Sequence, residues 1–207
     1  MGELARLYWF PLYAYLRRKG SAPPQAEDLV QGFFTRLLEK DALAGVERAK
    51  GKFRSFLLAC LNHFLANEWD KGRAQKRGGG GEALPLDAVD AEARYTAELT
   101  DDMTPERVFE RRWALAVLEQ VLTRLREDYV ERGQGAVFAA LEHLLVAGQA
   151  AGYGQIAERL GMSEAAVKVA AHRLRRRYRE LLRDEIAQTV AEPGLVNEEI
   201  LQLLDSL

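Results

Sequence analysis

The chain has 207 residues, of which 48% are hydrophobic and 29% are charged, and its formal net charge is −2. This composition is that of a globular protein and excludes a disordered or fibrous chain. A single cysteine, Cys60, excludes an internal disulfide framework, and no apolar run approaches the ~18 residues of a membrane span. We therefore expect a cytoplasmic protein that does not insert into a membrane.

Helical periodicity dominates the N-terminal third of the chain. Pro11 predicts the first turn of a helix that ends near Lys19, with Gly20 as its stop signal. Further helices are predicted over residues 23–40 and 53–73. In the helix predicted over 53–73, the apolar residues recur at the spacing of one helical face. They are Phe53, Phe56, Leu57, Cys60, Leu61, Phe64 and Leu65.

A glycine run, Gly78 to Gly81, follows these helices. Glycine loses the most conformational entropy on ordering, so four in a row predict a flexible joint. The stretch from Glu82 to Glu110 holds nine acidic and two basic residues, a net charge of −7. We predict a flexible acidic linker over residues 78–104, in which a transient helix could form. It follows a first domain at residues 1–77.

The C-terminal half also has a helical pattern. Thr104-Pro105 is typical of an N-cap followed by proline at the first helical position, and predicts a helix to about Arg126. A short helix over 136–146 and two helices separated by Gly161 follow. The fold class is therefore predicted as all-α, with two small helical domains joined by the Gly-rich acidic linker. The second domain is assigned residues 105–190, and 191–207 form an acidic tail that is a candidate docking helix.

The sharpest motif begins at Tyr153 and has the pattern of a helix-turn-helix. Ala157 is the small residue where two helices cross, and Gly161 lies four residues later at the turn. Ser163 is a good N-cap for the second helix. The apolar core positions are filled by Ile156, Leu160, Met162, Val167 and Ala170. The first residues of the second helix could enter a major groove, and the arginines after them lie near phosphates. The predicted DNA-binding residues are Ser163, Glu164, Ala165, Lys168, His172, Arg173, Arg175 and Arg176.

Charge is distributed unevenly along the chain. Residues 50–77 carry a net charge of +5 and residues 168–183 carry +6, whereas residues 184–207 carry −6. Basic blocks can neutralise phosphates and so favour nucleic-acid binding, although either block alone could be a solvated helix face. The acidic tail after the second block raises the hypothesis that the tail masks a DNA-binding helix.

Two stretches resemble a known family. The sequence YGQIAERLGMS from Tyr153, with AVK at 166–168 and HRLR at 172–175, resembles the C-terminal DNA-binding domain of bacterial RNA polymerase sigma factors of the short extracytoplasmic-function (ECF) class. Independently, AEDLVQGFFTRL at 26–37 resembles the helix by which the N-terminal sigma domain binds the polymerase clamp. FRSFL from Phe53, through Arg77, resembles the next helix of that domain, which carries promoter melting and minus-ten recognition. Together the matched stretches cover about two thirds of the chain.

The resemblance implies a transcription initiation factor without catalysis, cofactor or metal of its own. Its partners would be core RNA polymerase and promoter DNA, and an anti-sigma factor or another regulator is a further candidate. The resemblance implies polymerase contacts at Asp28, Gln31 and Thr35, with the helix-turn-helix reading the minus-thirty-five element. In the N-terminal domain it implies DNA contacts from Asn62, His63, Asn67, Trp69, Lys71, Arg73, Lys76 and Arg77.

The chain departs from the family pattern at several positions. Gly32 stands where family members usually have Glu, and Val169, Ala170 and Ala171 stand where they often have Ser, Arg and Leu. The departure at Ala170 removes one arginine that is a DNA contact in the family. The promoter sequence therefore does not carry over from the resemblance.

Two other classes of function remain open at this stage. A free-standing helix-turn-helix regulator, with an N-terminal domain that binds a partner or ligand, has the same C-terminal motif. An enzyme acting on nucleic acid would need a metal or nucleophile site. Cys60 and His63 have the spacing of two metal ligands on one helix, but no third ligand lies near them in the sequence. A buried thiol and an interfacial histidine are the simpler interpretation.

Overall fold

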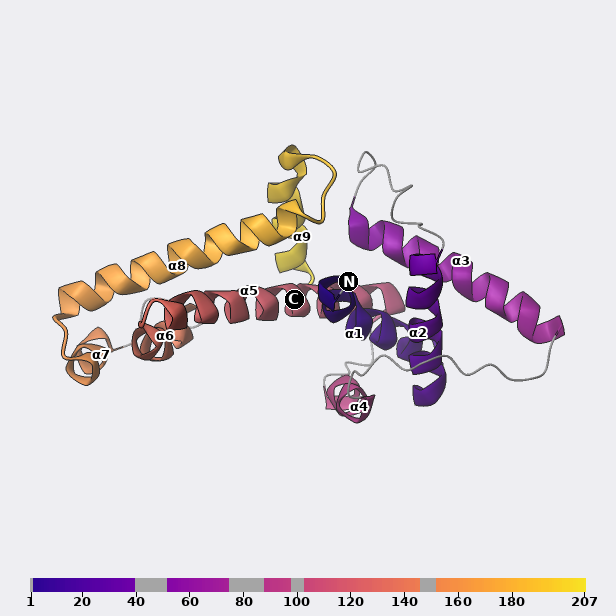
Figure 1. Cartoon of the computed structure of the whole chain (residues 1–207), viewed down its shortest axis with the longest axis horizontal. Helices are drawn as coiled ribbons and strands as arrows, with labels where there is room; N and C mark the ends of the chain where they lie inside the picture. The colour runs from indigo at the N-terminus through magenta and orange to yellow at the C-terminus, as the bar shows by residue number, and fades with distance from the viewer. Residues whose placement is uncertain (1, 40–51, 75–87, 98–102, 146–151) are drawn as a thin grey trace. The chain divides into compact units, whose positions relative to one another are not determined.

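The computed structural model is all-α throughout the part of the chain that it describes. That part forms nine α-helices and two short 3-10 helices and contains no strand (Figure 1). The all-α prediction is thereby confirmed for these residues, and none of their helices is long and apolar enough to cross a membrane. The described residues are 2–39, 52–74, 88–97, 103–145 and 152–207.

The chain divides into two compact units. The first unit is Met1–Ala116 together with Ala187–Leu207, and the second is Val117–Ile186. The segment 187–207, which includes the predicted tail, thus belongs to the same unit as the N-terminal helices. The domain boundaries predicted from the sequence stay a prediction.

The first unit is built around α1 (Gly2–Arg18), which packs against α2 (Pro23–Glu39). Side chains from Leu7 to Leu16 are buried on nearly every side of α1, apart from the half-buried Phe10. Such a helix is surrounded by protein and needs no polar face. The helix ends as predicted at Gly20, whose φ of +96° lies in the left-handed region that glycine adopts without steric cost.

The predicted start of this helix at Pro11 is wrong, because α1 begins at Gly2 and Pro11 lies inside it. An interior proline removes one helical hydrogen bond and costs about 3 kcal/mol. Leu7, Tyr8 and Trp9 are each no more than 6% exposed. Burying each of three large apolar side chains contributes about 1.5–3 kcal/mol, so their burial offsets the cost of the proline.

The third helix, α3 (Phe53–Ala74), carries the apolar stripe predicted for it. Leu57, Leu61 and Phe64 of this stripe are buried. The Phe64 ring lies edge-on to the ring of Phe33 in α2, with 5.8 Å between the ring centroids. Periodicity alone thus identified the packed face of α3.

Helix α4 (Ala88–Ala97) lies within the segment predicted to be a linker and contacts α1. The Glu92 carboxylate accepts hydrogen bonds from the Tyr13 hydroxyl at 2.6 Å and from two Arg17 nitrogens at 2.9 and 2.7 Å. The Arg17 guanidinium also lies 5.2 Å from the Tyr95 ring centroid. Polar contacts through one carboxylate therefore attach α4 to α1.

This attachment is expected to weaken in acid. The hydrogen bonds from Arg17 hold the pKa of the Glu92 carboxyl below its usual range. A lowered folded-state pKa stabilises the fold above the unfolded pKa of about 4.3, and this contribution is lost as the pH falls through the lowered pKa. In urea unfolding, Glu92→Gln is expected to cost about 1–2 kcal/mol at pH 7, and the difference from wild type should shrink below about pH 4. A cost that does not change with pH would contradict this, and the exposed Glu106→Gln serves as the control.

The C-terminal segment returns to the start of α3. The Phe53 amide donates to the Thr189 carbonyl at 3.0 Å, and the backbones of Lys52 and Val190 pair as an isolated antiparallel β-bridge. A 3-10 turn at Pro193–Leu195 then leads into α9 (Val196–Asp205). The candidate docking helix predicted from the tail sequence is thus a helix of the first unit.

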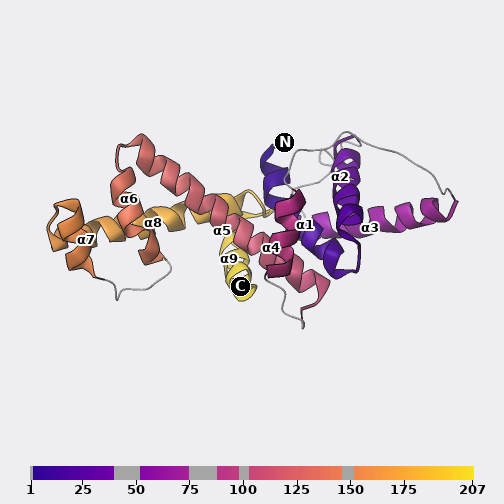
Figure 2. The ribbon, with the colours of Figure 1, turned by 90° about the horizontal axis from the view of Figure 1, so that it is seen from below.

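The second unit contains most of α5 (Pro105–Glu131) and α8 (Glu164–Ala187), with α6 (Gly135–Leu141), the 3-10 helix Glu142–Leu145 and α7 (Tyr153–Leu160). Gln120 and Arg124 of α5 bond to Glu185 of α8 at 2.9 and 2.7 Å. Further along α5, Asp128 accepts from Arg177 at 2.7 Å, so the two helices run antiparallel. Both views place α6 beside α7 at one end of this unit (Figure 1 and Figure 2).

Candidate nucleic-acid interface

The turn between α7 and α8 has the local geometry that its sequence predicts. Gly161 adopts φ +64° and ψ 30°, in the left-handed region, and caps α7. The Met162 amide donates to the Ala157 carbonyl at 2.9 Å, which closes the turn. The Ser163 hydroxyl accepts from the Ala166 amide at 3.2 Å and caps α8. The predicted roles of Gly161 and Ser163 are confirmed.

The apolar side chains of this segment hold α7 and α8 in the second unit. Ile156 and Ala157 of α7 are buried, as are Val167, Ala171 and Leu174 of α8. The other predicted core positions, Leu160, Met162 and Ala170, are half-buried. The side of α8 that faces away from this core is thereby fixed.

The predicted reading face of α8 lies in solvent. Its residues Glu164, Ala165, Lys168, His172 and Arg176 are all exposed. Lys168 pairs with Glu164 at 2.8 Å, and Arg176 pairs with Glu180 at 2.9 Å, both within one turn of the helix. Exposed pairs of this kind are screened by water and contribute little to stability. A phosphate group can therefore replace the carboxylates at little cost.

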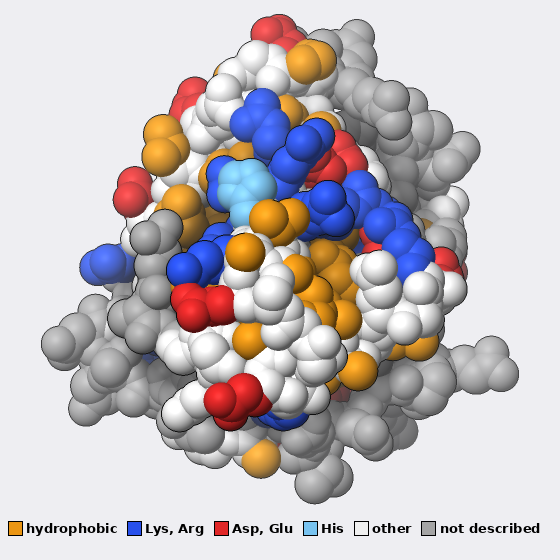
Figure 3. All heavy atoms as spheres, turned by 90° about the vertical axis from the view of Figure 1, so that its left-hand side faces the viewer, with side chains coloured by type: hydrophobic (Ala, Val, Ile, Leu, Met, Phe, Trp, Pro, Cys, Tyr) orange, Lys and Arg blue, Asp and Glu red, His pale blue; other side chains and the backbone are white. Residues whose placement is uncertain are grey.

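The arginines of α8 fall into two groups. Arg175 donates to the Leu144 carbonyl at 3.3 and 3.2 Å, and Arg177 donates to Asp128. Arg173 and Arg179 are exposed, and neither forms an ion pair with the residues that the structure describes. Figure 3 faces the part of the second unit that holds α7 and the start of α8, where basic side chains gather around a histidine with apolar side chains among them. Arg173 and Arg179 can reach phosphates, whereas Arg175 is engaged inside the unit.

One exposed residue of this face was not among the predicted site residues. Val169 is 50% exposed, and its neighbours one turn away are Ala165 and Arg173. Its position on the helix, opposite Val167 and Ala171, follows from the sequence alone. Among the predicted residues of α8 only Ala165 is apolar, and the prediction did not extend this apolar side to Val169.

The predicted DNA-binding residues of α3 are only partly available. The Asn62 side-chain oxygen accepts from the Tyr15 hydroxyl at 2.9 Å and from the Lys19 ammonium at 3.1 Å. The Asn67 amide nitrogen lies 2.7 Å from His63 Nδ1 and donates to the His63 carbonyl. Asn62, His63 and Asn67 thus lie along one side of α3. Of the remaining predicted residues, the structure describes no side chain for Trp69, Lys71 or Arg73, and Lys76 and Arg77 lie outside the described residues.

The predicted polymerase-binding residues lie together on α2. Asp28 and Thr35 are exposed and Gln31 is half-buried, while Val30 on the other side of the helix is fully buried. The Thr35 hydroxyl donates to the Gln31 carbonyl at 3.0 Å. Asp28 therefore exposes its carboxylate to a partner, next to two neutral polar side chains.

The C-terminal helix forms a buried ionic contact with the start of α3, here called the Glu199 clasp. Glu199 is fully buried and pairs with Arg54, which is 6% exposed, and with Lys52 at 3.2 Å. The Arg54 guanidinium also lies 4.6 Å from the Trp113 ring centroid. The tail hypothesis placed these acidic residues on the second basic block. In the structure, Glu199 pairs with the first block.

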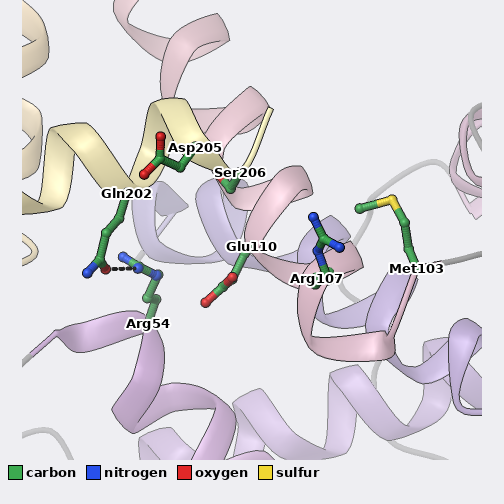
Figure 4. Close-up of a pocket in the computed structure, with 7 residues that line it drawn as sticks. All are labelled: Arg54, Met103, Arg107, Glu110, Gln202, Asp205 and Ser206. Carbon is green, nitrogen blue, oxygen red and sulfur yellow. Dashed lines mark hydrogen bonds between the residues drawn. The ribbon is translucent and has the colours of Figure 1, made fainter.

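A polar cavity of about 320 Å³ lies beside the Glu199 clasp (Figure 4). The side chains around it come from the start of α3, from the first turns of α5 and the segment just before it, and from the end of α9 and the residue after it. Its charged members are balanced, with two arginines and two carboxylates. The lining residues are Arg54, Met103, Arg107, Glu110, Gln202, Asp205 and Ser206.

In the part of the chain that the structure describes, no group of three or more His, Cys, Asp or Glu side chains is arranged to hold a metal ion. Cys60 is half-buried on α3, and burial raises the pKa of its thiol. This position agrees with a packed thiol.

No family model, curated protein or solved structure matches the chain. Its function is therefore inferred from the residues and from the geometry described above.

Proposed function

We propose that this protein is a sigma factor that binds core RNA polymerase and directs promoter recognition, DNA melting and transcription initiation. The observation that carries the proposal is the pairing of α7 and α8 across Gly161. It presents a capped helix whose core side is apolar and whose opposite side is exposed and basic. Such a helix fits a major groove with its first turns and neutralises phosphates with the arginines that follow.

The first unit supports the polymerase-binding part of the proposal. A helix that binds a protein partner through polar contacts needs an exposed polar face and must be held rigidly by its own packing. Helix α2 offers this, since Asp28, Gln31 and Thr35 share one side while Val30 and Phe33 are packed on the other. The protein would thus act by binding two partners and not by catalysis.

The test of this function is co-purification with bacterial core RNA polymerase. Wild type is expected to bind stoichiometrically, and Asp28→Arg with Gln31→Ala should reduce recovery at least tenfold. Glu131→Arg with Gln134→Ala makes the same chemical changes at exposed positions of the second unit and should bind like wild type. Failure of wild type to bind a compatible core enzyme would contradict the proposal.

A free-standing helix-turn-helix regulator is the second candidate. It is favoured by the segment Ala187–Leu207, which packs in the first unit after α8, an arrangement that the resemblance does not imply. This candidate requires specific binding to duplex DNA by the chain alone. Salt-dependent binding measured with and without polymerase separates the two functions.

A further inference from the structure

An apolar side chain lies at the centre of the exposed face of α8. Successive residues of an α-helix are ~100° apart, which places Val169 almost opposite the buried residues Val167, Ala171 and Leu174. Its own side chain is 50% exposed. Ala165, one turn earlier on the same side, is also exposed. The exposed face of α8 therefore has an apolar centre.

Cationic and polar side chains surround this centre. Lys168, His172 and Arg173 are exposed and lie within one turn of Val169. The only acidic side chain in the same turns, Glu164, is paired with Lys168. A partner that fits this face must offer anionic groups at the edges and an apolar group in the middle.

Duplex DNA offers this combination in its major groove. Phosphates line the edges of the groove, and the thymine C5-methyl group is the apolar feature of the base edges. Asn and Gln, which read adenine bidentately, are absent from residues 164–176, and Arg173 lies beyond the first turns of the helix. Methyl contact is therefore the base-specific interaction that the centre of this face can make.

We propose that Val169, with Ala165, contacts thymine methyl groups in the major groove and determines sequence specificity at those positions. The inference rests on the proposed function, because it requires α8 to enter a groove. Removing one buried methyl group from the contact should weaken binding about three- to tenfold.

The test first selects duplexes from a randomised pool with the full chain, alone and in complex with core RNA polymerase. Each thymine of the enriched duplex is then replaced singly by deoxyuridine, which lacks only the methyl group. Wild type is expected to bind the duplex three- to tenfold less tightly when one or two adjacent thymines are replaced. An enriched duplex that binds equally well with deoxyuridine at every position would overturn the inference.

Variants assign the methyl preference to a residue. Val169→Ser should lose the preference for thymine over deoxyuridine at the position that Val169 contacts. Val130→Ser changes another exposed valine of the second unit, 59% exposed on α5, and should keep the wild-type preference. Lys168→Gln should weaken both duplexes alike. If Val169→Ser keeps the preference, the inference is wrong. Enrichment of no duplex by either preparation would instead overturn the proposed function, and this inference with it.

Discussion

Replacing Glu199 by alanine is expected to lower the free energy of unfolding by about 3–5 kcal/mol. The carboxylate is fully buried, and its partners Arg54 and Lys52 are only 6% and 16% exposed. Without Glu199, two cations stay largely out of water and lose their main counter-charge. Urea unfolding of wild type and variant at pH 7 measures this cost.

Two further variants separate the ion pair from ordinary loss of packing. Glu198→Ala removes a carboxylate that pairs with the same lysine but is 57% exposed, and should change stability by less than about 1 kcal/mol. Arg54→Met combined with Glu199→Leu should recover most of the loss, because it removes the two most buried charges together and leaves Lys52 paired with Glu198. Equal costs for Glu198→Ala and Glu199→Ala would show that the clasp is not desolvated.

A second buried glutamate shows why partner exposure decides the magnitude. Glu185 is 5% exposed and bonds to Gln120 and Arg124, much like Glu199. The Arg124 side chain, however, is 45% exposed and can be hydrated when its partner is lost. Removing this carboxylate therefore leaves no cation buried, unlike the removal of Glu199.

Local chemistry was enough to predict most helices. Periodic apolar residues were enough to locate α2 and α3. Each predicted N-cap needs only one hydroxyl: Thr104 accepts from the Arg107 amide at 3.3 Å, and Ser163 accepts from the Ala166 amide at 3.2 Å. The start of α1 was missed because a local rule about Pro11 was outweighed by tertiary burial.

The partner of the C-terminal segment could not be predicted from charge. Its acidic residues match either basic block in sign, and the two blocks differ by a single unit of net charge. Glu199 pairs with Lys52 and Arg54 because Arg54 is buried beside Trp113 and because backbone contacts near Thr189 bring the segment there. Arg54 and Glu199 are 145 residues apart in the sequence. Sequence patterns hold no information on such distant contacts.

The candidate interface was predictable to the level of a helix face but not of each side chain. Helical spacing separates the inward from the outward residues of α8. It does not distinguish Arg173 from Arg175, because the Leu144 carbonyl that holds Arg175 belongs to another element. Only the folded unit shows which arginines remain available to a ligand.

The combined change Lys168→Gln, Arg173→Gln and Arg176→Gln is expected to lower affinity for duplex DNA about 100- to 1000-fold at ~0.15 M salt. These three side chains are exposed, and the carboxylates near them form only surface pairs. Each phosphate contact that is lost should also reduce the slope of log affinity against log salt by about 0.9, so the slope should fall by about 2.7. Titrations over a salt series, with the polymerase complex if required, measure both quantities.

The control is a matched change of the partnered arginines, Arg175→Gln with Arg177→Gln. Both guanidinium groups donate to other elements of the second unit, at the Leu144 carbonyl and the Asp128 carboxylate. Their loss should lower stability, by about 1–3 kcal/mol for each acceptor left unsatisfied, and should leave the salt slope within about one unit of wild type. The reverse pattern, with a large change of slope only for the partnered pair, would mean that DNA does not meet the exposed face of α8. That result would exclude the groove-reading face on which the proposed function depends.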